Sequence, residues 1–418
     1  MNILVFEDEQ VKQLYPITLA RPAYAITCGC LRLSDWLASL SGNVIGSVRP
    51  HLQDLQALDF SFFASELDAS EPLTLIVNAR IAPCVANFEK LNAIAKGNNE
   101  NMTARTVAVD QDGNVGVAIV PTDALKDGLP SSVADVTSKL QPDSDVKLDV
   151  LQFPHDIVRF NQEHFNANLN HLIEKGNFKQ LQDGVFVGNN CSISKHVEFD
   201  TSDGPIVIAD SAKVGPFTYF AGPVYVGPHC KIAEHASIKD YVCLVHTVKA
   251  GGEIEATVIE PYSNKQHHGF LGHSYLGSWI NLGAGTCNSD LKNTYGKVNA
   301  SYGGNKVSTG MQFVGCFVGD YSKTAINTSI FTGKSIGVCS MLYGFVAADV
   351  PSFVNYAQTF GQSSQVPADV MVTTQQRMFG RRKVEQRPAD IQLIHDMLAL
   401  TEQDRTSRNI PEGNLSFG

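Results

Sequence analysis

Through much of its second half, this chain of 418 residues carries an apolar or small residue at every sixth position. One unbroken run has six members and a later run has five, which is hard to explain by chance alternation in an ordinary all-β domain. The positions that share this register are Val187, Ile193, Phe199, Ile208, Val214, Phe220, Val226, Ile232, Ile238, Leu276, Leu282, Val318, Thr324, Ile330, Ile336 and Leu342. A strand-and-turn unit that repeats every six residues builds a solenoid and stacks these residues inward. We therefore predict a parallel β-helix over residues 184–350.

The first part of the chain has a different pattern. Asn2–Phe6 (NILVF) and Leu73–Val77 (LTLIV) are short apolar runs typical of buried parallel strands. Leu31–Leu40 and Asn87–Ala95 instead have the spacing of amphipathic helices. Short strands alternating with helices predict a Rossmann-like α/β domain, which we place at residues 1–155.

Three further segments complete the expected organisation. Residues 155–175 carry apolar residues at helical spacing and predict a linking helix, to which we assign residues 156–183. Residues 351–418 lose the six-residue pattern and form a tail, in which Ala389–Leu400 predicts a helix that follows Pro388. Glu253–Lys297 interrupts the register, so we expect it to project from the solenoid wall as a loop, where functional residues often lie.

Charge and hydropathy exclude several classes of protein. The 32 Lys and Arg residues against 42 Asp and Glu residues give a net charge of −10, which argues against a nucleic-acid partner that needs many phosphate contacts. No apolar stretch reaches the roughly 18 residues that a membrane span needs. The opening MNILVFEDEQ lacks the basic and long apolar regions of a signal peptide, so we expect a cytoplasmic protein.

The six-residue register resembles the left-handed parallel β-helix of the hexapeptide acyltransferases. Within it, His267–Thr286 (HHGFLGHSYLGSWINLGAGT) is similar to the acetyltransferase domain of the bifunctional N-acetylglucosamine-1-phosphate uridylyltransferase/glucosamine-1-phosphate acetyltransferase. In that family a His precedes an aromatic residue, Leu and Gly, and Asn-Ile-Gly-Ala-Gly-Thr follows. The resemblance covers most of the chain, is sharper after residue 184, and is closest to a divergent bacterial branch. It implies a homotrimer that uses acetyl-coenzyme A as a co-substrate, with Ala284 in contact with it.

The resemblance implies a histidine base for acetyl transfer. The attacking amine must be neutral, and a histidine with a pKa near 6.5 is a suitable proton acceptor. His267 matches the family histidine and ranks first. His273 ranks second because it lies one six-residue unit further along. His268 is expected to face the opposite way.

Sugar and phosphate contacts are also implied by the resemblance. Asn281 matches the family asparagine that holds the sugar, and Asn288 and Lys292 fall near positions that bind the sugar phosphate. Two positions depart from the family: Phe270 replaces a tyrosine, and Glu255 stands where a lysine is expected. Substrate contacts therefore differ in part from those of glucosamine-1-phosphate.

The N-terminal domain resembles the sugar-1-phosphate nucleotidyltransferases. Leu14–Pro22 (LYPITLARP) is similar to their L-x-P-L-T-x-x-x-P-K signature, which implies that Arg21 clamps a phosphate. The Gly-rich phosphate loop of those enzymes is replaced by the acidic Phe6-Glu7-Asp8-Glu9. Such a sequence repels a triphosphate unless a metal intervenes, so Glu7 and Asp8 are candidate Mg²⁺ ligands. Asn78 and Arg80 stand at the strand end where the family holds its metal, and are candidate substrate contacts.

Three functions are compatible with these patterns. The first is a transferase of nucleotide-sugar synthesis that joins a sugar-1-phosphate to a nucleoside triphosphate, of the UDP-N-acetylglucosamine diphosphorylase type, and acetylates glucosamine-1-phosphate. The second is a single-activity nucleotidyltransferase, for example of the glucose-1-phosphate thymidylyltransferase type, whose β-helix only trimerises it. The third is a non-catalytic scaffold that binds a sugar nucleotide.

Overall fold

The computed structural model describes residues 1–40, 42–97, 103–125, 129, 131–142 and 144–416. The chain divides into two compact units. The first contains residues 1–14, 21–26 and 31–152, and the second contains residues 15–20, 27–30 and 153–418. Among the described residues, no helix is both long and apolar enough to cross a membrane.

The first unit is built on a mixed five-stranded sheet with the order β2-β1-β3-β5-β4. Its strands are β1 Asn2–Phe6, β2 Val44–Ser47, β3 Leu73–Asn78, β4 Arg105–Val109 and β5 Val115–Pro121. β2, β1 and β3 are parallel, whereas β5 pairs antiparallel with both β3 and β4. Every residue of β1 and β3 is buried, as expected for apolar strands covered on both faces.

Short helices accompany this sheet. They are α1 Leu33–Ala38, α2 Gln53–Asp59, α3 Val85–Lys96 and α4 Ser131–Ser138, with 3-10 helices at Glu9–Leu14, Ala23–Ala25, Pro50–Leu52 and Thr122–Leu125. The helices predicted at Leu31–Leu40 and Asn87–Ala95 are confirmed as α1 and α3, each with shifted ends. The predicted α/β domain is likewise confirmed, although its sheet is only partly parallel.

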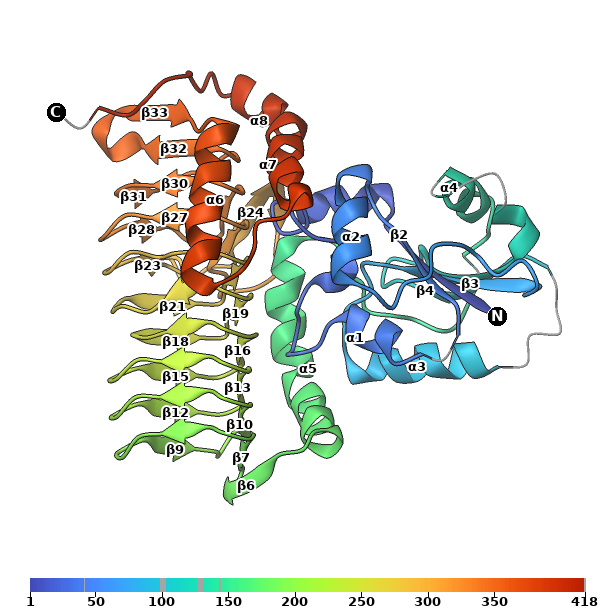
Figure 1. The fold of residues 1–418 in the computed structure, drawn as a ribbon, viewed down its shortest axis with the longest axis horizontal. Coiled ribbons are helices and arrows are strands. Elements are labelled where there is room, and N and C mark those ends of the chain that lie inside the picture. Colours follow the sequence, from blue (N-terminus) through green and yellow to red (C-terminus); the bar gives the residue numbers. More distant parts are fainter. Residues whose placement is uncertain (41, 98–102, 126–128, 130, 143, 417–418) are drawn as a thin grey trace. The chain divides into compact units, whose positions relative to one another are not determined.

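The second unit is a β-solenoid whose coils stack one above another (Figure 1). One wall is a sheet of β6 Lys179–Gln182, β7 Val185–Val187, β10 Ile206–Ile208, β13 Val224–Val226, β16 Val242–Leu244, β19 Val258–Ile259, β22 Tyr275–Leu276, β26 Cys316–Val318 and β29 Lys334–Ile336. β6 is the antiparallel member at its lower edge. The residues that carry the six-residue register from Ile208 onward are buried, and most of them form one continuous core. The predicted solenoid is therefore confirmed.

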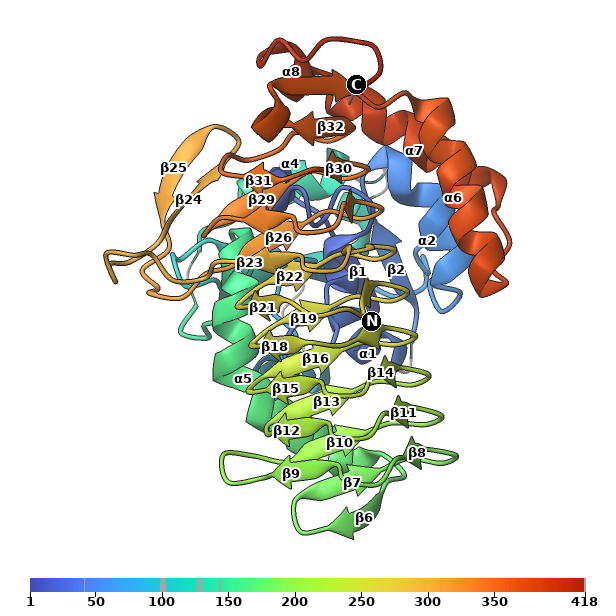
Figure 2. The same ribbon diagram turned by 90° about the vertical axis from the view of Figure 1, so that its left-hand side faces the viewer.

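Two further walls complete each coil (Figure 2). The second wall contains β8 Ser192–Ile193, β11 Lys213–Val214, β14 Lys231–Ile232, β17 Lys249–Ala250 and β20 Asn264–Lys265, and later β27 Lys323–Thr324, β30 Met341–Leu342, β32 Val354–Ala357 and β33 Gln362–Gln365. The third contains β9 Glu198–Asp200, β12 Tyr219–Ala221, β15 Ser237–Lys239, β18 Glu253–Glu255 and β21 Phe270–Gly272, and then β23 Cys287–Asn288, β28 Ser329–Ile330 and β31 Phe345–Val346. Each wall meets the next at a sharp corner.

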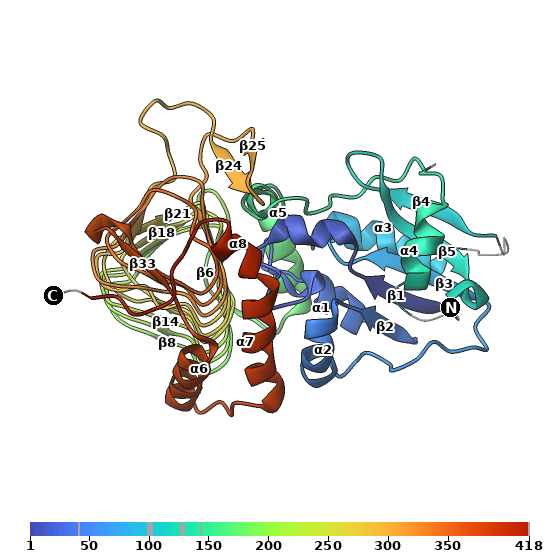
Figure 3. The same cartoon turned by 90° about the horizontal axis from the view of Figure 1, so that it is seen from above.

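The expected loop at Glu253–Lys297 is wrong in its position. The coils continue through β18 to β23, because this part of the chain takes shorter coils rather than leaving the solenoid. The segment that does project is residues 289–315, which contains the hairpin of β24 Asn299–Tyr302 and β25 Asn305–Ser308 (Figure 3).

Helices flank the solenoid within the second unit. α5 Pro154–Lys175 confirms the predicted linking helix, and its Asn161 Nδ2 donates to the Tyr241 carbonyl over 2.8 Å. After a 3-10 helix at Gln358–Phe360 come α6 Ala368–Arg382, α7 Pro388–Leu400 and α8 Glu402–Thr406. α7 confirms the helix predicted at Ala389–Leu400. α6, which was not predicted, packs its Phe379 ring on Trp279 of the solenoid.

Candidate active sites

The first candidate site lies at the carboxyl ends of β1 and β3. These parallel strands are neighbours, and Phe6 pairs with Asn78 at their ends. The carboxyl ends of parallel strands are where α/β folds commonly bind ligands. Glu7, Asp8, Asn78 and Arg80 therefore come together, as the sequence predicted for a site at this edge.

Glu7 is completely engaged by protein donors. Its carboxylate receives Nε and Nη2 of Arg49 at 2.9 and 3.1 Å, and the backbone N–H groups of Arg49 and Ala23 at 3.0 and 2.8 Å. The Glu7 side chain is only 1% exposed. A bidentate Arg–carboxylate pair with two added backbone donors holds three chain segments together.

Asp8 is held in a similar way by Arg80. The guanidinium donates through Nε and Nη2 to the two carboxylate oxygens at 2.8 and 2.7 Å, and Asn78 Nδ2 adds a third bond at 2.8 Å. Arg80 also donates to the Leu151 carbonyl and to Gln10. Its side chain is 2% exposed, whereas that of Asp8 is 24% exposed. Arg80 is thus committed to the fold, and Asp8 keeps one accessible edge.

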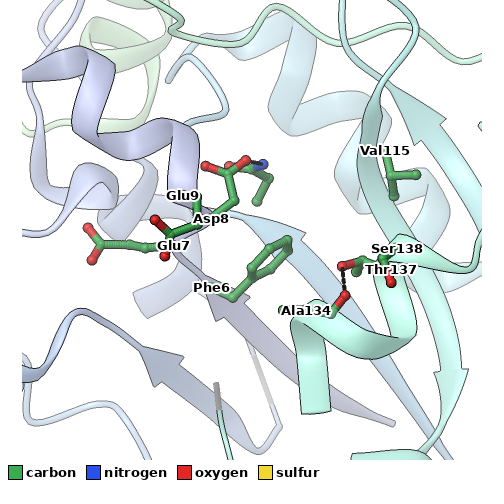
Figure 4. A pocket seen from close by; sticks show the side chains of 9 residues that line it. Phe6, Glu7, Asp8, Glu9, Val115, Ala134, Thr137 and Ser138 are labelled. Atoms are coloured by element: carbon green, nitrogen blue, oxygen red, sulfur yellow. Dashed lines mark hydrogen bonds between the residues drawn. The ribbon is translucent and has the colours of Figure 1, made fainter. Parts of the chain in front are cut away.

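A cavity of about 500 Å³ opens beside this cluster. Its walls are Phe6, Glu7, Asp8, Glu9, Asn78, Val115, Ala134, Thr137 and Ser138. In Figure 4 the Phe6 ring points toward α4, which contributes Thr137 and Ser138, whereas Glu7 points away from α4. Among the described residues that line the cavity there is no Lys or Arg. The cavity therefore offers hydroxyl and carboxylate groups and no cation of its own.

These groups do not form a ready Mg²⁺ site. Mg²⁺ needs free carboxylate oxygens in near-octahedral geometry. Both oxygens of Glu7 and both oxygens of Asp8 already accept hydrogen bonds from arginine. The assignment of Glu7 and Asp8 as metal ligands stays a prediction. Their ion pairs with arginine instead indicate that both residues stabilise the fold. Arg21, the predicted phosphate clamp, is half-buried, and its carbonyl accepts Nη2 of Arg49 at 3.1 Å.

The second candidate site lies on the third wall of the solenoid, where β21 separates the predicted histidines. His267 and His268 are exposed at the corner before β21, and Ala284 lies on the same edge in the next coil. His273 lies at the corner after β21. His267 and His273 are therefore at opposite ends of one strand and do not share a site within one chain.

His273 has the surroundings of an oriented base. Its Nδ1 is 2.8 Å from Oδ2 of Asp290, and the two side chains are 9% and 13% exposed. The Phe313 ring stacks on the imidazole at 5.1 Å between centroids. The His273 backbone is hydrogen-bonded to Glu255 in the coil below and to Gly315 in the coil above. A carboxylate on Nδ1 fixes the tautomer and leaves Nε2 for proton transfer.

Two more carboxylates lie in the coils below His273. Asp240 is at the corner after β15, and Glu255 ends β18, the strand that pairs with β21. Burial raises the pKa of both carboxyl groups, and the charge of Asp203 raises that of Asp240 further. The His273 corner is thus strongly acidic.

Asn288 and Asn281 differ in their surroundings. Asn288 is buried, and its amide accepts from the Gly272 N–H at 2.8 Å and donates to the Gly272 carbonyl at 3.0 Å. It therefore holds the residue that precedes His273. Asn281 is exposed, and it accepts from Asn264 Nδ2 at 3.2 Å. Lys292 lies in the projecting segment, where Nζ donates to the Lys297 carbonyl at 2.8 Å.

The sequence analysis missed Asp290 and Phe313. Both belong to residues 289–315, which the six-residue register does not cover. One available signal was an acidic residue two positions after the Cys287–Asn288 strand, since corner residues of stacked coils meet one another. No periodic signal places Phe313, which reaches His273 from the far end of the projecting segment.

Comparison with known proteins agrees with this two-part organisation. Residues 3–177 match the family described as sugar nucleotidyl transferase, and residues 205–240 match the bacterial transferase hexapeptide, a set of six repeats. The chain is therefore a transferase that joins a nucleotidyltransferase domain to a hexapeptide acyltransferase domain.

One distant homologue matches most of the chain, and others match less than half of it. A bifunctional sugar-1-phosphate nucleotidylyltransferase/acetyltransferase from Sulfurisphaera tokodaii is 24% identical over 72% of this chain and 75% of its own length. The bifunctional proteins GlmU of Trichodesmium erythraeum and Francisella philomiragia are 27% and 29% identical over 38% and 43% of this chain. The matches span only 25% and 35% of those two GlmU proteins.

Solved structures overlap less closely. The Francisella novicida UDP-N-acetylglucosamine acyltransferase is 12% identical, with a TM-score of 0.20 over 52% of this chain and 78% of that chain. We draw no conclusion from an overlap of this extent.

Proposed function

We propose that this chain is a bifunctional enzyme of nucleotide-sugar synthesis. Its first unit transfers a nucleotidyl group from a nucleoside triphosphate to a sugar-1-phosphate and releases pyrophosphate. Its solenoid transfers an acetyl group from acetyl-coenzyme A to the amine of an amino-sugar phosphate. N-Acetylglucosamine-1-phosphate and glucosamine-1-phosphate are the proposed sugar substrates. The homology to a bifunctional enzyme and the two matched families support this proposal.

The observation that carries the acetyl-transfer half is the His273–Asp290 pair. A general base must be held in one orientation, with a proton-accepting nitrogen open to the substrate. His273 meets this requirement, whereas His267 is exposed and has no carboxylate partner among the described residues. We therefore assign the base to His273 rather than to His267, the first choice from sequence. Asn288 then acts by positioning Gly272 beside the base.

The nucleotidyl-transfer half rests on the cavity at the ends of β1 and β3. In this proposal Mg²⁺ arrives with the triphosphate, because the carboxylates of Glu7 and Asp8 are already occupied. Arg21 remains the proposed phosphate clamp. The acidic, cation-free lining of the cavity also favours a second candidate for this unit, a sugar-nucleotide binder that no longer transfers.

We also propose the homotrimer that acyltransferases of this kind suggest, and its walls offer complementary charge. Lys213, Lys231 and Lys249 lie in register on the second wall, where like charges repel. The third wall carries Glu198 and Glu253 in one outward column, with Tyr219 and Ser237 between them. A rotation that brings the second wall of one copy against the third wall of the next would pair these columns.

The proposed function is tested by following two products in one preparation. Purified wild-type protein is given acetyl-coenzyme A with glucosamine-1-phosphate, and separately each of four nucleoside triphosphates with sugar-1-phosphates. We expect thiol release in the first assay and pyrophosphate release in the second. His273→Ala should lower the thiol-release rate by about 10²–10⁴, the usual contribution of a general base.

His267→Ala, at the corner on the other side of β21, is the matched control, and it should leave thiol release near the wild-type rate. Neither change should alter pyrophosphate release, which depends on the other unit. If His267→Ala carries the loss instead, the base assignment is wrong. If the wild type releases no thiol with any amino-sugar phosphate, the solenoid acts only as a scaffold.

A further inference from the structure

Two carboxylates beside the proposed base have no partner in the fold. Asp240 and Glu255 are partly buried, yet no described residue donates a hydrogen bond to either side chain or forms an ion pair with it. Lys239, the nearest cation, is already bound to Glu253 over 2.7 Å. The backbone carbonyl of Glu255 accepts from the His273 N–H, so this residue lies directly beneath the base.

Such an arrangement is unfavourable without a ligand. Carboxylates withdrawn from water lose hydration, and they repel one another unless a cation or donors compensate. Burial raises the pKa of both groups, and Asp203 and Asp290 add further negative charge around them. Among the described residues near this corner, only His273 and Lys239 oppose that charge. The corner is therefore suited to a positively charged ligand.

His273 is an independent observation that points to a ligand at the same place. Its side chain is nine-tenths buried, and Asp290 occupies only Nδ1. Nε2, on the other side of the ring, has no hydrogen-bond partner within the described part of the chain. Nε2 is not among the fully buried atoms of the described chain, so this nitrogen of a largely buried side chain is accessible to a substrate group or a water molecule.

The chemistry of N-acylation requires more than one proton acceptor. An amino sugar arrives mostly as an ammonium ion, which cannot attack a thioester. One proton must leave before attack, and a second leaves the nitrogen as the amide forms. A single imidazole accepts one proton at a time, so a second acceptor beside it removes this restriction.

We infer that Asp240 and Glu255 recognise the ammonium group of the acyl acceptor, and that Glu255 accepts its first proton. This inference rests on the proposed acetyl transfer, and it names the specificity determinant of that site. It makes an acceptor with a primary amine the substrate class and disfavours acceptors with only hydroxyl groups.

The step balances as follows. The ammonium gives one proton to the Glu255 carboxylate, and the neutral amine attacks the thioester carbonyl to form the new C–N bond. His273 Nε2 takes the second proton from that nitrogen. The C–S bond then breaks, and the leaving thiolate takes the proton from the imidazolium. The Glu255 proton passes to solvent, so one amide, one thiol and one proton are produced.

The test measures binding without acetyl-coenzyme A. Isothermal titration compares glucosamine-1-phosphate with glucose-1-phosphate, which replaces the amine by a hydroxyl group. We expect the wild type to prefer the amine, and Glu255→Gln to reduce that preference about tenfold or more, as for the loss of a charged hydrogen bond. Asp240→Asn should reduce it in the same direction. Glu234→Gln removes one charge from an exposed position between β14 and β15, outside the proposed site, and should leave the preference unchanged.

Each outcome decides one of the two claims. A wild type without preference for the amine, or a Glu255→Gln variant that keeps the full preference, overturns the inference. If the preference is present and depends on Glu255 but the wild type releases no thiol, amine recognition stands and the proposed acetyl transfer fails. If thiol is released at the same rate by the wild type and by Glu255→Gln, acetyl transfer stands and Glu255 is not the proton acceptor.

Discussion

The two candidate sites treat charge in opposite ways. At the ends of β1 and β3, each carboxylate is matched with an arginine, Glu7 with Arg49 and Asp8 with Arg80. At the His273 corner, Asp240 and Glu255 carry partly buried charge that no described cation pairs. A carboxylate paired with arginine has few oxygen lone pairs left to bind a ligand. An unpaired, partly buried carboxylate destabilises the fold, but its oxygens can bind a substrate group or accept a proton.

This contrast shows that a residue's place in a sequence motif does not by itself show whether its polar groups are free to bind a substrate. Asn78 and Arg80 were predicted as substrate contacts because of where they stand in the chain, yet their polar groups are used by Asp8, Gln10 and Leu151. His273 ranked second by motif, but it has an orienting carboxylate and an open nitrogen. An inventory of hydrogen-bond partners therefore discriminates between residues that a motif alone treats alike.

The strongest way to break this comparison is to remove a compensating charge from the first unit. Arg80→Met should lower the free energy of unfolding of that unit by about 3–5 kcal/mol, because it leaves Asp8 unpaired and removes a donor from the Leu151 carbonyl. Chemical denaturation followed by circular dichroism measures this loss. Adding Asp8→Asn to the variant should restore part of it.

Lys139→Met provides the matched surface control for Arg80. Lys139 pairs with Asp135 over 2.6 Å, but both side chains are more than half exposed. Exposed pairs contribute little, so we expect a change within about 0.5 kcal/mol. If Arg80→Met is as mild as this control, the arginine is not committed to the fold and is again a candidate for phosphate binding.

A smaller loss of stability is expected from Asn288, a polar residue of the second site whose side chain is hydrogen-bonded within the fold. Asn288→Ala removes both hydrogen bonds to Gly272 and leaves its buried N–H without this acceptor, whereas its carbonyl still accepts from Ser274 Oγ. We expect a loss of about 1–3 kcal/mol in unfolding free energy, together with a lower rate of thiol release. The Michaelis constant for the sugar phosphate distinguishes the alternatives, since a phosphate contact would raise it while leaving stability nearly unchanged.

The fold was largely predictable from sequence because its main signal is periodic. Every six-residue position from Ile208 to Ile238 points inward, and each coil of that stretch repeats the same geometry. Prediction failed where the period changes. Ile238, Ile254 and Leu271 stack directly although they are 16 and 17 residues apart instead of the regular 18. A count in steps of six therefore assigns the residues of these shorter coils to the wrong walls.

The sequence could not locate the two histidines in the coils for the same reason. Assigning a corner or a wall to His267 and His273 requires the coil length, which changes in this stretch of the chain. The partner Asp290 then depends on where the chain leaves the solenoid, at residue 289, and no local pattern marks that point. α6 was not predicted because few of its residues are buried, so its sequence carries only a weak apolar pattern.

The smallest expected effect concerns Lys265. Its ammonium group is buried in the solenoid, and no described carboxylate forms an ion pair with it. Its Nζ donates to the carbonyls of Gly251 and His267 at 2.9 and 2.6 Å, and burial lowers its pKa from 10.5 to about 8. Between these two values the unfolded chain binds the proton and the folded chain does not. Lys265 therefore makes stability rise with pH in that window, by about 1 kcal/mol per pH unit.

Lys265→Met should remove this slope, so the difference in unfolding free energy between wild type and variant should change by about 1 kcal/mol between pH 8.5 and 9.5. Burial raises the pKa of the Cys230 thiol to about 12, so buried thiols make stability fall with pH in this range. They do so equally in wild type and variant, and their contribution cancels in the difference between the two unfolding free energies. Lys213→Met removes a lysine from the exposed side of the same wall. The change in unfolding free energy that it causes over this pH range is subtracted as the contribution of a surface lysine. A difference that stays constant over this range would mean that Lys265 remains protonated in the folded chain, and that this charge too is compensated.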